Sequence, residues 1–453
     1  MQKAAPLSFA FIVGTTCLAF VVSQLDISIV NVALPQISRS LGADVSQLQW
    51  IVDAYTIAFA VLMLSAGGMG DLLGAKHLFQ LGLVAFGLAS AGCGFAESPL
   101  SLIIFRALQG LGSAIMIPSS LAILNQSFAH DNLQRSRAVS FWTAAGSIAI
   151  ASGLILGGLL LQVSNWRMIF FVNLPICLIG LLLSVRLAES EKHPNNGFDI
   201  PGQLTWMVAL TILIACIIEL HHFGFGSLWI YGGLIFSIVA FILFIVIEKR
   251  ATAPILSLDL FRSAHFNVII LLGMVFNSAY YGTIFVLSLY LQNVLHYSAL
   301  AAGIAFLPLT GGFVISNLLS GRAMNRYGIR VPVLTGIFIF IVGFAELYSV
   351  KADTPYWRLF IPFFTIPLGM GLAIPAMTTA ILGGVTRTLS GTVSAIFNTS
   401  RQAAGAMGVA VYGTIAYGGT AAVVNSISIS AIATVAVGLC AAFLVYKNLK
   451  RAS

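Results

Sequence analysis

The sequence carries very little charge for its length. Of its 453 residues only 8% are charged, 22 of them basic and 14 acidic, whereas soluble domains carry about 25% charged residues. So few charges cannot cover the surface of a water-soluble fold of this size, which excludes a soluble multidomain enzyme. The net charge of +8 would suggest a nucleic-acid partner only if the basic residues formed patches, and they do not. A polytopic membrane protein is what remains.

The sequence also lacks the patterns of disulfide, metal and nucleotide sites. Its five cysteines fall within apolar segments and show no metal-like spacing, so we expect them to pack rather than to pair. Glu219, His221 and His222 have no further matched ligand, and no metal site is predicted. A phosphate loop of the Gly-x4-Gly-Lys type is missing, so ATP is not the expected energy source. We expect no cofactor and no enzymatic activity.

What the sequence has in abundance is long apolar runs. Crossing the hydrocarbon core takes roughly 20 apolar residues as a helix. These runs are continuously apolar rather than alternating, which excludes a transmembrane β-barrel. We therefore predict an all-α polytopic membrane protein with 14 transmembrane helices, at approximately residues 8–34, 47–66, 77–96, 100–123, 137–160, 165–186, 199–220, 227–248, 266–291, 298–320, 331–350, 356–382, 394–416 and 424–446.

The distribution of Lys and Arg predicts the orientation of these helices. With the N-terminus inside, sixteen of the 22 basic residues fall in cytoplasmic positions, and Arg39, Arg167, Lys351 and Arg358 fall on the other side. Cytoplasmic loops of membrane proteins carry such an excess. We expect a multi-pass protein of the cell inner (plasma) membrane with both termini cytoplasmic, and a first helix that is retained rather than cleaved as a signal peptide.

Two loops of similar pattern indicate an internal repeat. Residues 67–76 and 321–330 each place a Gly, a charge, a second Gly and a basic residue at matching intervals. Transporters are often built from such repeated helix groups. We predict an N-terminal six-helix bundle (residues 1–190), two inserted transmembrane helices with linkers (191–255) and a C-terminal six-helix bundle (256–453).

Several short motifs occur in a characteristic order along the chain. They are Leu25-Asp-Ile-Ser-Ile-Val-Asn-Val-Ala-Leu-Pro35, Gln49-Trp-Ile-Val-Asp-Ala-Tyr55, Arg106-Ala-Leu-Gln-Gly-Leu-Gly-Ser-Ala114, Trp166-Arg-Met-Ile-Phe-Phe-Val-Asn-Leu-Pro175 and Asn398-Thr-Ser-Arg-Gln402. With them, the sequence resembles the fourteen-helix drug:proton antiporter family of the major facilitator superfamily. The resemblance covers nearly the whole chain.

Three charged residues inside helices are candidates for proton coupling. Ionisable groups within a membrane are costly and usually functional. Asp26 lies about two-thirds along the first helix, and we interpret it as a proton site, with a structural hydrogen bond as the alternative. The resemblance implies that Arg106 takes part in proton coupling with the acidic residues of the first two helices. The alternative is that Arg106 belongs to a purely structural polar network. Asp53 is an outer proton-entry candidate, or a solvated residue at a helix start.

The resemblance also implies a cytoplasmic gate and an antiporter packing motif. For the gate it implies a contact between Asp71 and the start of the fifth helix, where Arg135 and Arg137 lie; the alternative is a simple cluster of topology-determining charges. The gating residues are Gly67, Asp71, Gly74, Lys76 and Arg137. A stripe of small residues allows close helix contact, and the antiporter-motif residues are Gly146, Gly153, Gly157 and Gly158.

A polar and aromatic set is the candidate lining of a substrate cavity. Aromatic faces can hold a lipophilic cation, although Tyr and Phe are also common as core or interfacial residues. The candidate lining residues are Asn31, Tyr55, Gln109, Asn277, Tyr280, Tyr281 and Phe285.

Together these features predict a secondary active transporter. We expect proton-coupled efflux of lipophilic, cationic or neutral compounds by alternating access, with small-molecule substrate, protons and the lipid bilayer as partners and a monomer as the working unit. One alternative is a dedicated metabolite exporter or a proton symporter, supported by Leu154 where the family has Pro. A non-transport membrane scaffold would not need a buried titratable pair.

Overall fold

The computed structural model describes residues 8–189, 199–224, 226–251, 254, 256, 258–383 and 390–448. In these residues the chain is helical, with α1 (Phe9–Leu41), α2 (Val45–Leu73), α3 (Ala75–Gly94), α4 (Pro99–Ser127), α5 (Asn132–Val163), α6 (Met168–Phe171), α7 (Asn173–Ser184), α8 (Ile200–Ile218), α9 (Leu220–Phe223), α10 (Leu228–Arg250), η1 (Leu258–Arg262), α11 (Ala264–Leu289), η2 (Tyr290–Val294), α12 (Ala299–Ala305), α13 (Leu307–Tyr327), α14 (Arg330–Leu347), α15 (Tyr356–Gly383), α16 (Ser390–Ile415) and α17 (Thr420–Asn448).

This architecture confirms the all-α membrane fold. Twelve segments among the described residues are long and apolar enough to cross a membrane by length and composition. The shorter apolar stretch Met168–Ser184 and the 26-residue α16 correspond to the two other predicted spans. Each of the fourteen apolar runs therefore has its helical counterpart.

Two of the predicted spans are each divided into two helices. The sixth is divided at Val172 between α6 and α7. The tenth is divided at Phe306 between α12 and α13, and Pro308 stands in the first turn of α13. Proline has no backbone N–H, so in a first turn, where that donor would be unpaired, it costs no helical hydrogen bond.

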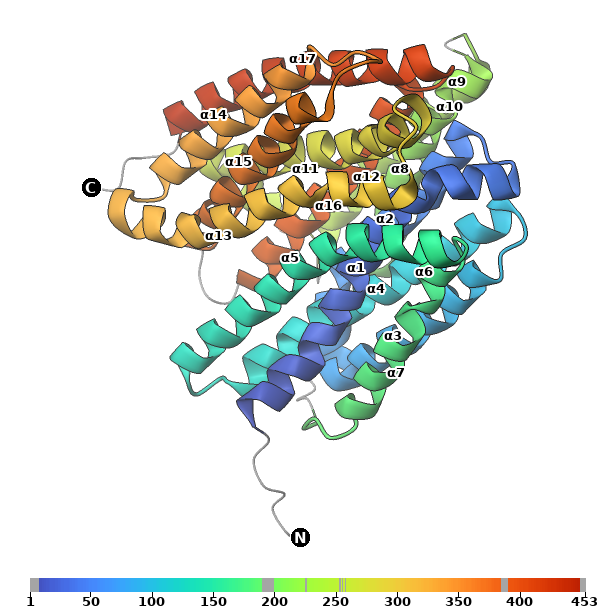
Figure 1. Ribbon diagram of the computed structural model, residues 1–453. Coiled ribbons are helices and arrows are strands. Elements are labelled where there is room, and N and C mark those ends of the chain that lie inside the picture. The colour runs from blue at the N-terminus through green and yellow to red at the C-terminus, as the bar shows by residue number, and fades with distance from the viewer. Residues whose placement is uncertain are drawn as a thin grey trace.

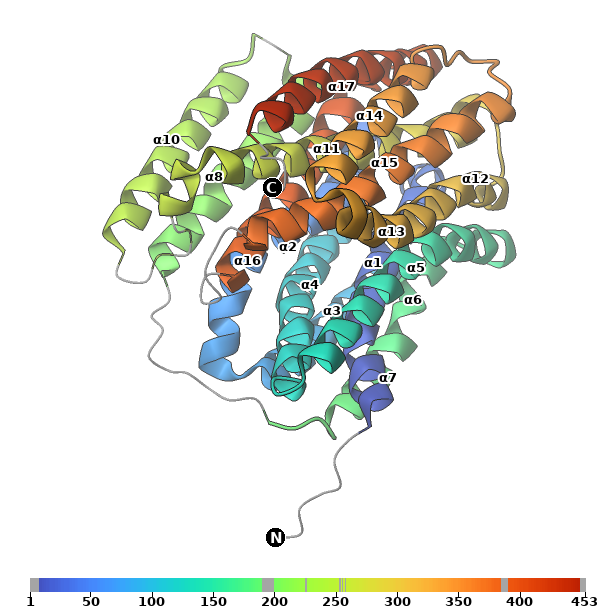
Figure 2. The ribbon, with the colours of Figure 1, turned by 90° about the vertical axis from the view of Figure 1, so that its left-hand side faces the viewer.

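The helices form two groups with a pair of helices beside them. Figure 1 shows α1 to α7, coloured blue to green, together in the lower part of the view, and α11 to α17, coloured yellow to red, above them. In Figure 2 the hairpin of α8 and α10 lies along one flank. This arrangement is compatible with the predicted division into two six-helix bundles and an insertion.

Hydrogen bonds join the two groups in one half of the bundle. We call the end at which α1 begins the proximal end, and the end at which α1 finishes the distal end. Near the distal end, the side-chain amide of Gln49 on α2 donates to the carbonyls of Val409 (3.2 Å) and Ala410 (2.7 Å) on α16. Gln292 donates to the Val32 carbonyl at 3.0 Å. These bonds hold α2 to α16 and η2 to α1.

A close backbone crossing adds to this distal contact. A Cβ atom at Gly158 of α5 would lie 2.7 Å from the Cα of Leu300 on α12. A Cβ at Gly303 of α12 would collide with the carbonyl oxygen of Leu154 on α5. Both positions need glycine because the two backbones touch, which is how small residues bring membrane helices together.

The inserted helix α8 contacts both groups. Its residues Leu210, Ile214 and Ile218 share one buried apolar cluster with residues of α2 and α16. The Gln203 amide donates to the Val61 carbonyl of α2 at 2.8 Å, and Thr414 of α16 donates to the Ile217 carbonyl at 3.0 Å. Helix α8 thus covers the seam between α2 and α16 along one flank.

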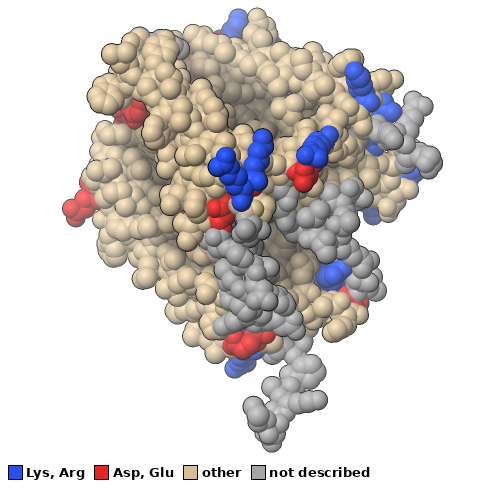
Figure 3. Space-filling model, turned by 180° about the vertical axis from the view of Figure 1, so that it is seen from behind, with Lys and Arg blue, Asp and Glu red and all other residues tan. Residues whose placement is uncertain are grey.

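The surface fits the membrane interpretation. On the face shown in Figure 3, Lys, Arg, Asp and Glu occur in a few small groups on a broad uncharged background. Large apolar side chains are exposed on several helices, for example Leu88 (70%), Leu318 (66%) and Phe338 (67%). In water these side chains would be unfavourable, whereas lipid accommodates them.

Candidate functional site

The centre of the N-terminal group contains a buried ion pair. Arg106 on α4 pairs through its guanidinium with the carboxylate of Asp26 on α1, and the two residues are 1% and 0% exposed. Arg106 also donates through Nε to the Ile51 carbonyl of α2 at 3.1 Å. A buried charge is tolerated only when it is paired and hydrogen-bonded, and both conditions hold here.

Three neutral side chains complete the hydrogen bonding of this pair. Gln109 accepts from Arg106 at 2.7 Å and donates to Asp26 Oδ1 at 2.9 Å. Asn173 on α7 donates to the same Oδ1 at 2.8 Å and to Ser90 of α3 at 2.9 Å. The network therefore links α1, α3, α4 and α7 around one carboxylate.

Sequence reasoning did not identify Asn173 and Ser90 as members of this site. Asn173 belongs to one of the motifs that carry the family resemblance, but the motif did not indicate what this side chain does. Ser90 had no signal, because one serine in an apolar helix matches no spacing rule. Gln109 was expected in the substrate cavity, and the structure instead positions it in the ion-pair network.

Tyr55 separates the ion pair from a pocket. Its hydroxyl group is hydrogen-bonded to Ser23 and Ser113, each at 2.6 Å, and its ring lies 4.4 Å from the central carbon of the Arg106 guanidinium. A cation over an aromatic ring is attracted to it. Tyr55 also lines the pocket, so one aromatic side chain contacts both features.

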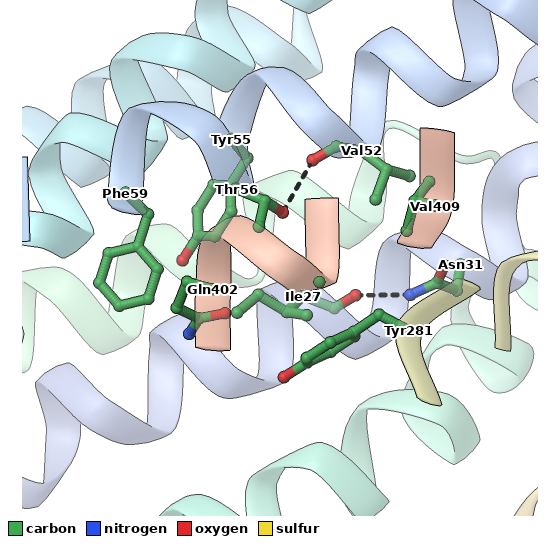
Figure 4. Close-up of a pocket in the computed structure, with 10 residues that line it drawn as sticks. Ile27, Asn31, Val52, Tyr55, Thr56, Phe59, Tyr281, Gln402 and Val409 are labelled. Carbon is green, nitrogen blue, oxygen red and sulfur yellow. Dashed lines mark hydrogen bonds between the residues drawn. The ribbon is translucent and has the colours of Figure 1, made fainter. Parts of the chain in front are cut away.

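The pocket lies between the two helix groups. It has about 20 Å³ of volume accessible to water, and a water molecule needs roughly 10–15 Å³ of such volume. Figure 4 shows Tyr281 and Gln402, from the C-terminal group, across from Ile27 and Tyr55, from the N-terminal group. The lining residues are Ile27, Asn31, Val52, Tyr55, Thr56, Phe59, Tyr281, Gln402, Gly405 and Val409.

The remaining cavity candidates on α11 lie outside this pocket. Phe285 is fully buried and Tyr280 is 4% exposed, with the Tyr280 ring packed against Tyr281 and Phe313. Asn277 donates within its own helix, to the Gly273 carbonyl at 3.4 Å. Of the candidates on α11, Tyr281 borders the pocket.

Asp53 is buried apart from the ion pair. It is 0% exposed, and both of its carboxylate oxygens lack a hydrogen-bond partner. Ile51 and Tyr55 contact Arg106 on one side of α2, and Asp53, midway between them in sequence, points to the opposite side of the helix. Arg106 therefore pairs with Asp26 and not with Asp53.

The gate residues are described only in part. Gly67 and Asp71 belong to α2, but their side chains, and with them the expected contact of Asp71 with Arg137, lie outside what the structure describes. Gly74 joins α2 to α3 with a positive φ of 88°. Lys76 is 7% exposed and donates to the carbonyls of Val185 and Leu187 beyond α7 and to Glu189.

The glycine stripe of α5 packs closely on other helices. A Cβ at Gly146 would collide with the Phe20 ring, one at Gly153 with Ser28, and one at Gly157 would lie 2.8 Å from the side chain of Ile29, all on α1. Gly158 instead faces α12 of the other group. The stripe therefore serves both the packing within one group and the contact between groups.

Known proteins are similar to this chain over most of its length. Residues 16–409 match the family model described as Major Facilitator Superfamily. The chain is 33% identical over 399 residues to the methylenomycin A resistance protein of Bacillus subtilis (strain 168), covering 88% of this chain and 85% of that protein. It is 31% identical over 394 residues to the tetracenomycin C resistance and export protein of Streptomyces glaucescens, covering 86% and 73%.

A solved structure shares the fold. The crystal structure of the peptide transporter POT in complex with sulfate superimposes with a TM-score of 0.72, covering 96% of this chain and 94% of that chain. The identity is 14%, so this similarity concerns the arrangement of helices alone.

Proposed function

Because the chain belongs to the Major Facilitator Superfamily, we propose that it exports lipophilic compounds in exchange for protons. The relatives support export, since their names describe antibiotic resistance and, for one of them, resistance and export. The chain covers 85% and 73% of these two relatives, so the comparison extends over most of each protein.

The observation that carries the proposal is the contact of Tyr55 with both the ion pair and the pocket. A proton that binds Asp26 removes the counter-charge of Arg106. The guanidinium then keeps only neutral partners, Gln109 and the Ile51 carbonyl, and an uncompensated charge in this place is costly. Arg106 must shift, and Tyr55, stacked on it, shifts with it and reshapes the pocket wall.

Asp53 is the second proton site of the proposal. An ionised carboxylate without hydrogen bonds would be very unfavourable inside the membrane, so the arrangement fits a protonated Asp53. Asp26, with its arginine and amide partners, fits an ionised group. In this conformation the proposal therefore assigns a proton to Asp53 of α2 and none to Asp26 of α1.

The proposed orientation makes the proximal end cytoplasmic, as the Lys and Arg distribution predicts. The distal contacts of Gln49 and Gly158 then close the outer side, which supports a state closed toward the outside. Moving one proton inward across 100 mV supplies roughly 2.3 kcal/mol, which is enough to maintain an about fifty-fold ratio of substrate concentrations across the membrane. The proposed cytoplasmic gate remains the set Gly67, Asp71, Gly74, Lys76 and Arg137. The proposed working unit is a monomer, because the two groups of one chain together line the pocket.

The test is proton movement in proteoliposomes when a substrate gradient is imposed. We expect Asp26→Asn to lower substrate-dependent proton flux at least tenfold, while Asp259→Asn, an exposed residue paired with Arg262, leaves it unchanged. A neutral probe (1-naphthylacetamide) and a cationic one (ethidium) cover both expected substrate types. Unchanged coupling in Asp26→Asn would contradict the proposal, and proton flow in the direction of the substrate would indicate symport.

A further inference from the structure

Arg401 on α16 is a cation without a counter-charge. Its Nε is buried and has no hydrogen-bond partner, and none of the ion pairs in the described residues includes it. The guanidinium lies 5.4 Å from the centre of the Phe397 ring. Arginine stays charged in proteins, so this group differs from Arg106, whose charge is compensated by Asp26.

The C-terminal group offers Arg401 no acidic partner. The C-terminal 198 residues, 256–453, contain three acidic residues, Asp259, Glu346 and Asp353. All three are exposed: Asp259 lies in η1, Glu346 at the distal end of α14, and Asp353 in the loop after it. Asp26, in the other group, is already engaged by Arg106.

Arg401 lies beside the pocket. The next residue, Gln402, and Gly405, one helical turn further on, both line it. The carbon chain of Arg401 passes Gly273 of α11, where a Cβ would lie 3.1 Å from it, and Tyr281, two turns further along α11, is another lining residue. The residue is half-buried, so part of it borders open space.

The pocket itself contains no acidic side chain that could hold a cation. Its ten lining residues are apolar, aromatic, or neutral and polar. A lipophilic cation placed there would approach the Arg401 charge and find no compensating carboxylate. A carboxylate bound next to Arg401, at the edge of the pocket, would gain a planar guanidinium whose geometry suits two parallel hydrogen bonds.

We propose that Arg401 binds the acidic group of a lipophilic organic acid, which is the substrate class of this transporter. The inference rests on the proposed export function and specifies its substrate. The pocket has a volume of about 20 Å³ in this conformation, so the substrate binds in the wider state of the proposed alternating-access cycle. In that state the carboxylate pairs with the guanidinium, Tyr281 and Gln402 supply neutral hydrogen-bonding groups, and Ile27, Val52 and Phe59 face the apolar body of the substrate.

The depth of Arg401 distinguishes a soluble acid from a lipid headgroup. It stands eleven residues after the first residue of α16, roughly 16 Å along the helix axis, and the hydrocarbon core is about 30 Å thick. Arg401 is therefore close to the middle of the bilayer, where phosphate headgroups do not reside.

Export of an acid has an electrical consequence. An anion that leaves and a proton that enters both move positive charge inward, so a one-for-one exchange carries two elementary charges. A neutral substrate exchanged for one proton carries one. Transport of the acid should therefore respond more steeply to membrane potential than transport of its amide.

The test uses three probes that share one ring system: 1-naphthylacetate, 1-naphthylacetamide and 1-naphthylethylammonium. Binding is measured at pH 7.5 in phosphatidylcholine nanodiscs, with and without added phosphatidylglycerol. We expect the wild type to bind the acetate most tightly. Arg401→Gln should weaken acetate binding at least tenfold, or 1.4 kcal/mol, and amide binding less than twofold. Arg401→Lys should keep the preference for the acid, and Arg262→Gln, far from the pocket, should change nothing.

The outcomes separate this inference from the export proposal. If the wild type binds the acetate no better than the amide, or if Arg401→Gln weakens both equally, the assignment of Arg401 is wrong. Proton-coupled transport of the amide or the cation would then still support export. If phosphatidylglycerol competes with the acetate, the site is one for lipid headgroups, and the substrate assignment is also wrong. In proteoliposomes, equal voltage dependence for acetate and amide would contradict it as well.

Discussion

The guanidinium of Arg106 pairs with the carboxylate of Asp26 across 80 residues of sequence, and both side chains are closed off from solvent. Four helices contribute to this one contact, because Gln109, Ser90 and Asn173 complete its hydrogen bonds. The pair therefore fixes the packing of the N-terminal group as well as being the proposed site of proton coupling.

Removing one partner of this pair should cost more stability than removing both. Arg106→Met leaves the Asp26 carboxylate buried without its counter-charge, and such losses amount to about 3–5 kcal/mol. The double variant Arg106→Met with Asp26→Leu leaves no charge and should melt at a higher temperature than Arg106→Met. Melting of the purified protein, followed by tryptophan fluorescence, measures this. Equal melting temperatures would mean that the charges are not coupled.

Asn173→Leu should reduce proton-coupled transport about tenfold. The substitution keeps the number and branching of the side-chain heavy atoms but removes one donor to the Asp26 carboxylate, and hydrogen bonds to charged groups contribute about 1.5–3 kcal/mol. Cys177→Ala, one turn further along α7 and also buried, is the matched control and should transport normally. If the two variants transport equally well in the proteoliposome assay, Asn173 has a packing role and no role in proton coupling.

Gly158→Leu should prevent closure of the distal end. A side chain there meets the backbone of Leu300, so α5 and α12 cannot approach. A cysteine placed at Thr56 in the pocket, in a chain whose native cysteines are replaced by alanine, should react faster with an impermeant maleimide added from the distal side. Gly14→Leu, where no atom lies within 4 Å, is the control. Unchanged labelling would show that the crossing does not seal the pocket.

Glu219→Ala should loosen the inserted helix pair. The carboxylate at the distal end of α8 accepts from the Trp50 indole at 2.8 Å and from Ser46 at 3.2 Å. Losing both bonds should lower the melting temperature and speed hydrogen exchange in the last turn of α8. The exposed Glu346, replaced by Ala, provides the comparison and should show neither effect. Protection of α8 as in the wild type would mean that apolar contacts alone hold it.

The helices were predictable because each run of apolar residues is long enough to cross a membrane, and length alone constrains its conformation. The breaks at Val172 and Phe306 were not predicted, since Asn173 and Pro308 lie within continuously apolar runs that read as single spans. Hydropathy indicates the total length of an apolar segment, but it does not detect a break between two helices inside that segment.

The site was predictable in its charges and not in its neutral members. A charge inside a membrane is rare, so Asp26, Asp53 and Arg106 were conspicuous in the sequence. Ser90 belongs to the site because α3 is oriented with this serine toward α4 and α7. That orientation depends on how the three helices pack, and the sequence of α3 alone does not reveal it. The same applies to Phe285 and Tyr280: their residue type suits a cavity, but the rotation of α11 directs them into the core.

The alanines that α16 presents to α8 bear on how such a molecule can move. Ala403, Ala406 and Ala410 belong to the buried cluster shared with α8 and α2, and none of them has a side chain with rotamers to rearrange. Against α2, by contrast, α8 is held at two levels, through Gln203 and Glu219. Toward α16, the hydrogen bond from Thr414 to the Ile217 carbonyl lies at the distal end, and the shared cluster below it is apolar. When the two groups rock against each other, we therefore expect the inserted pair to move with the first group, while its apolar contact with α16 shifts.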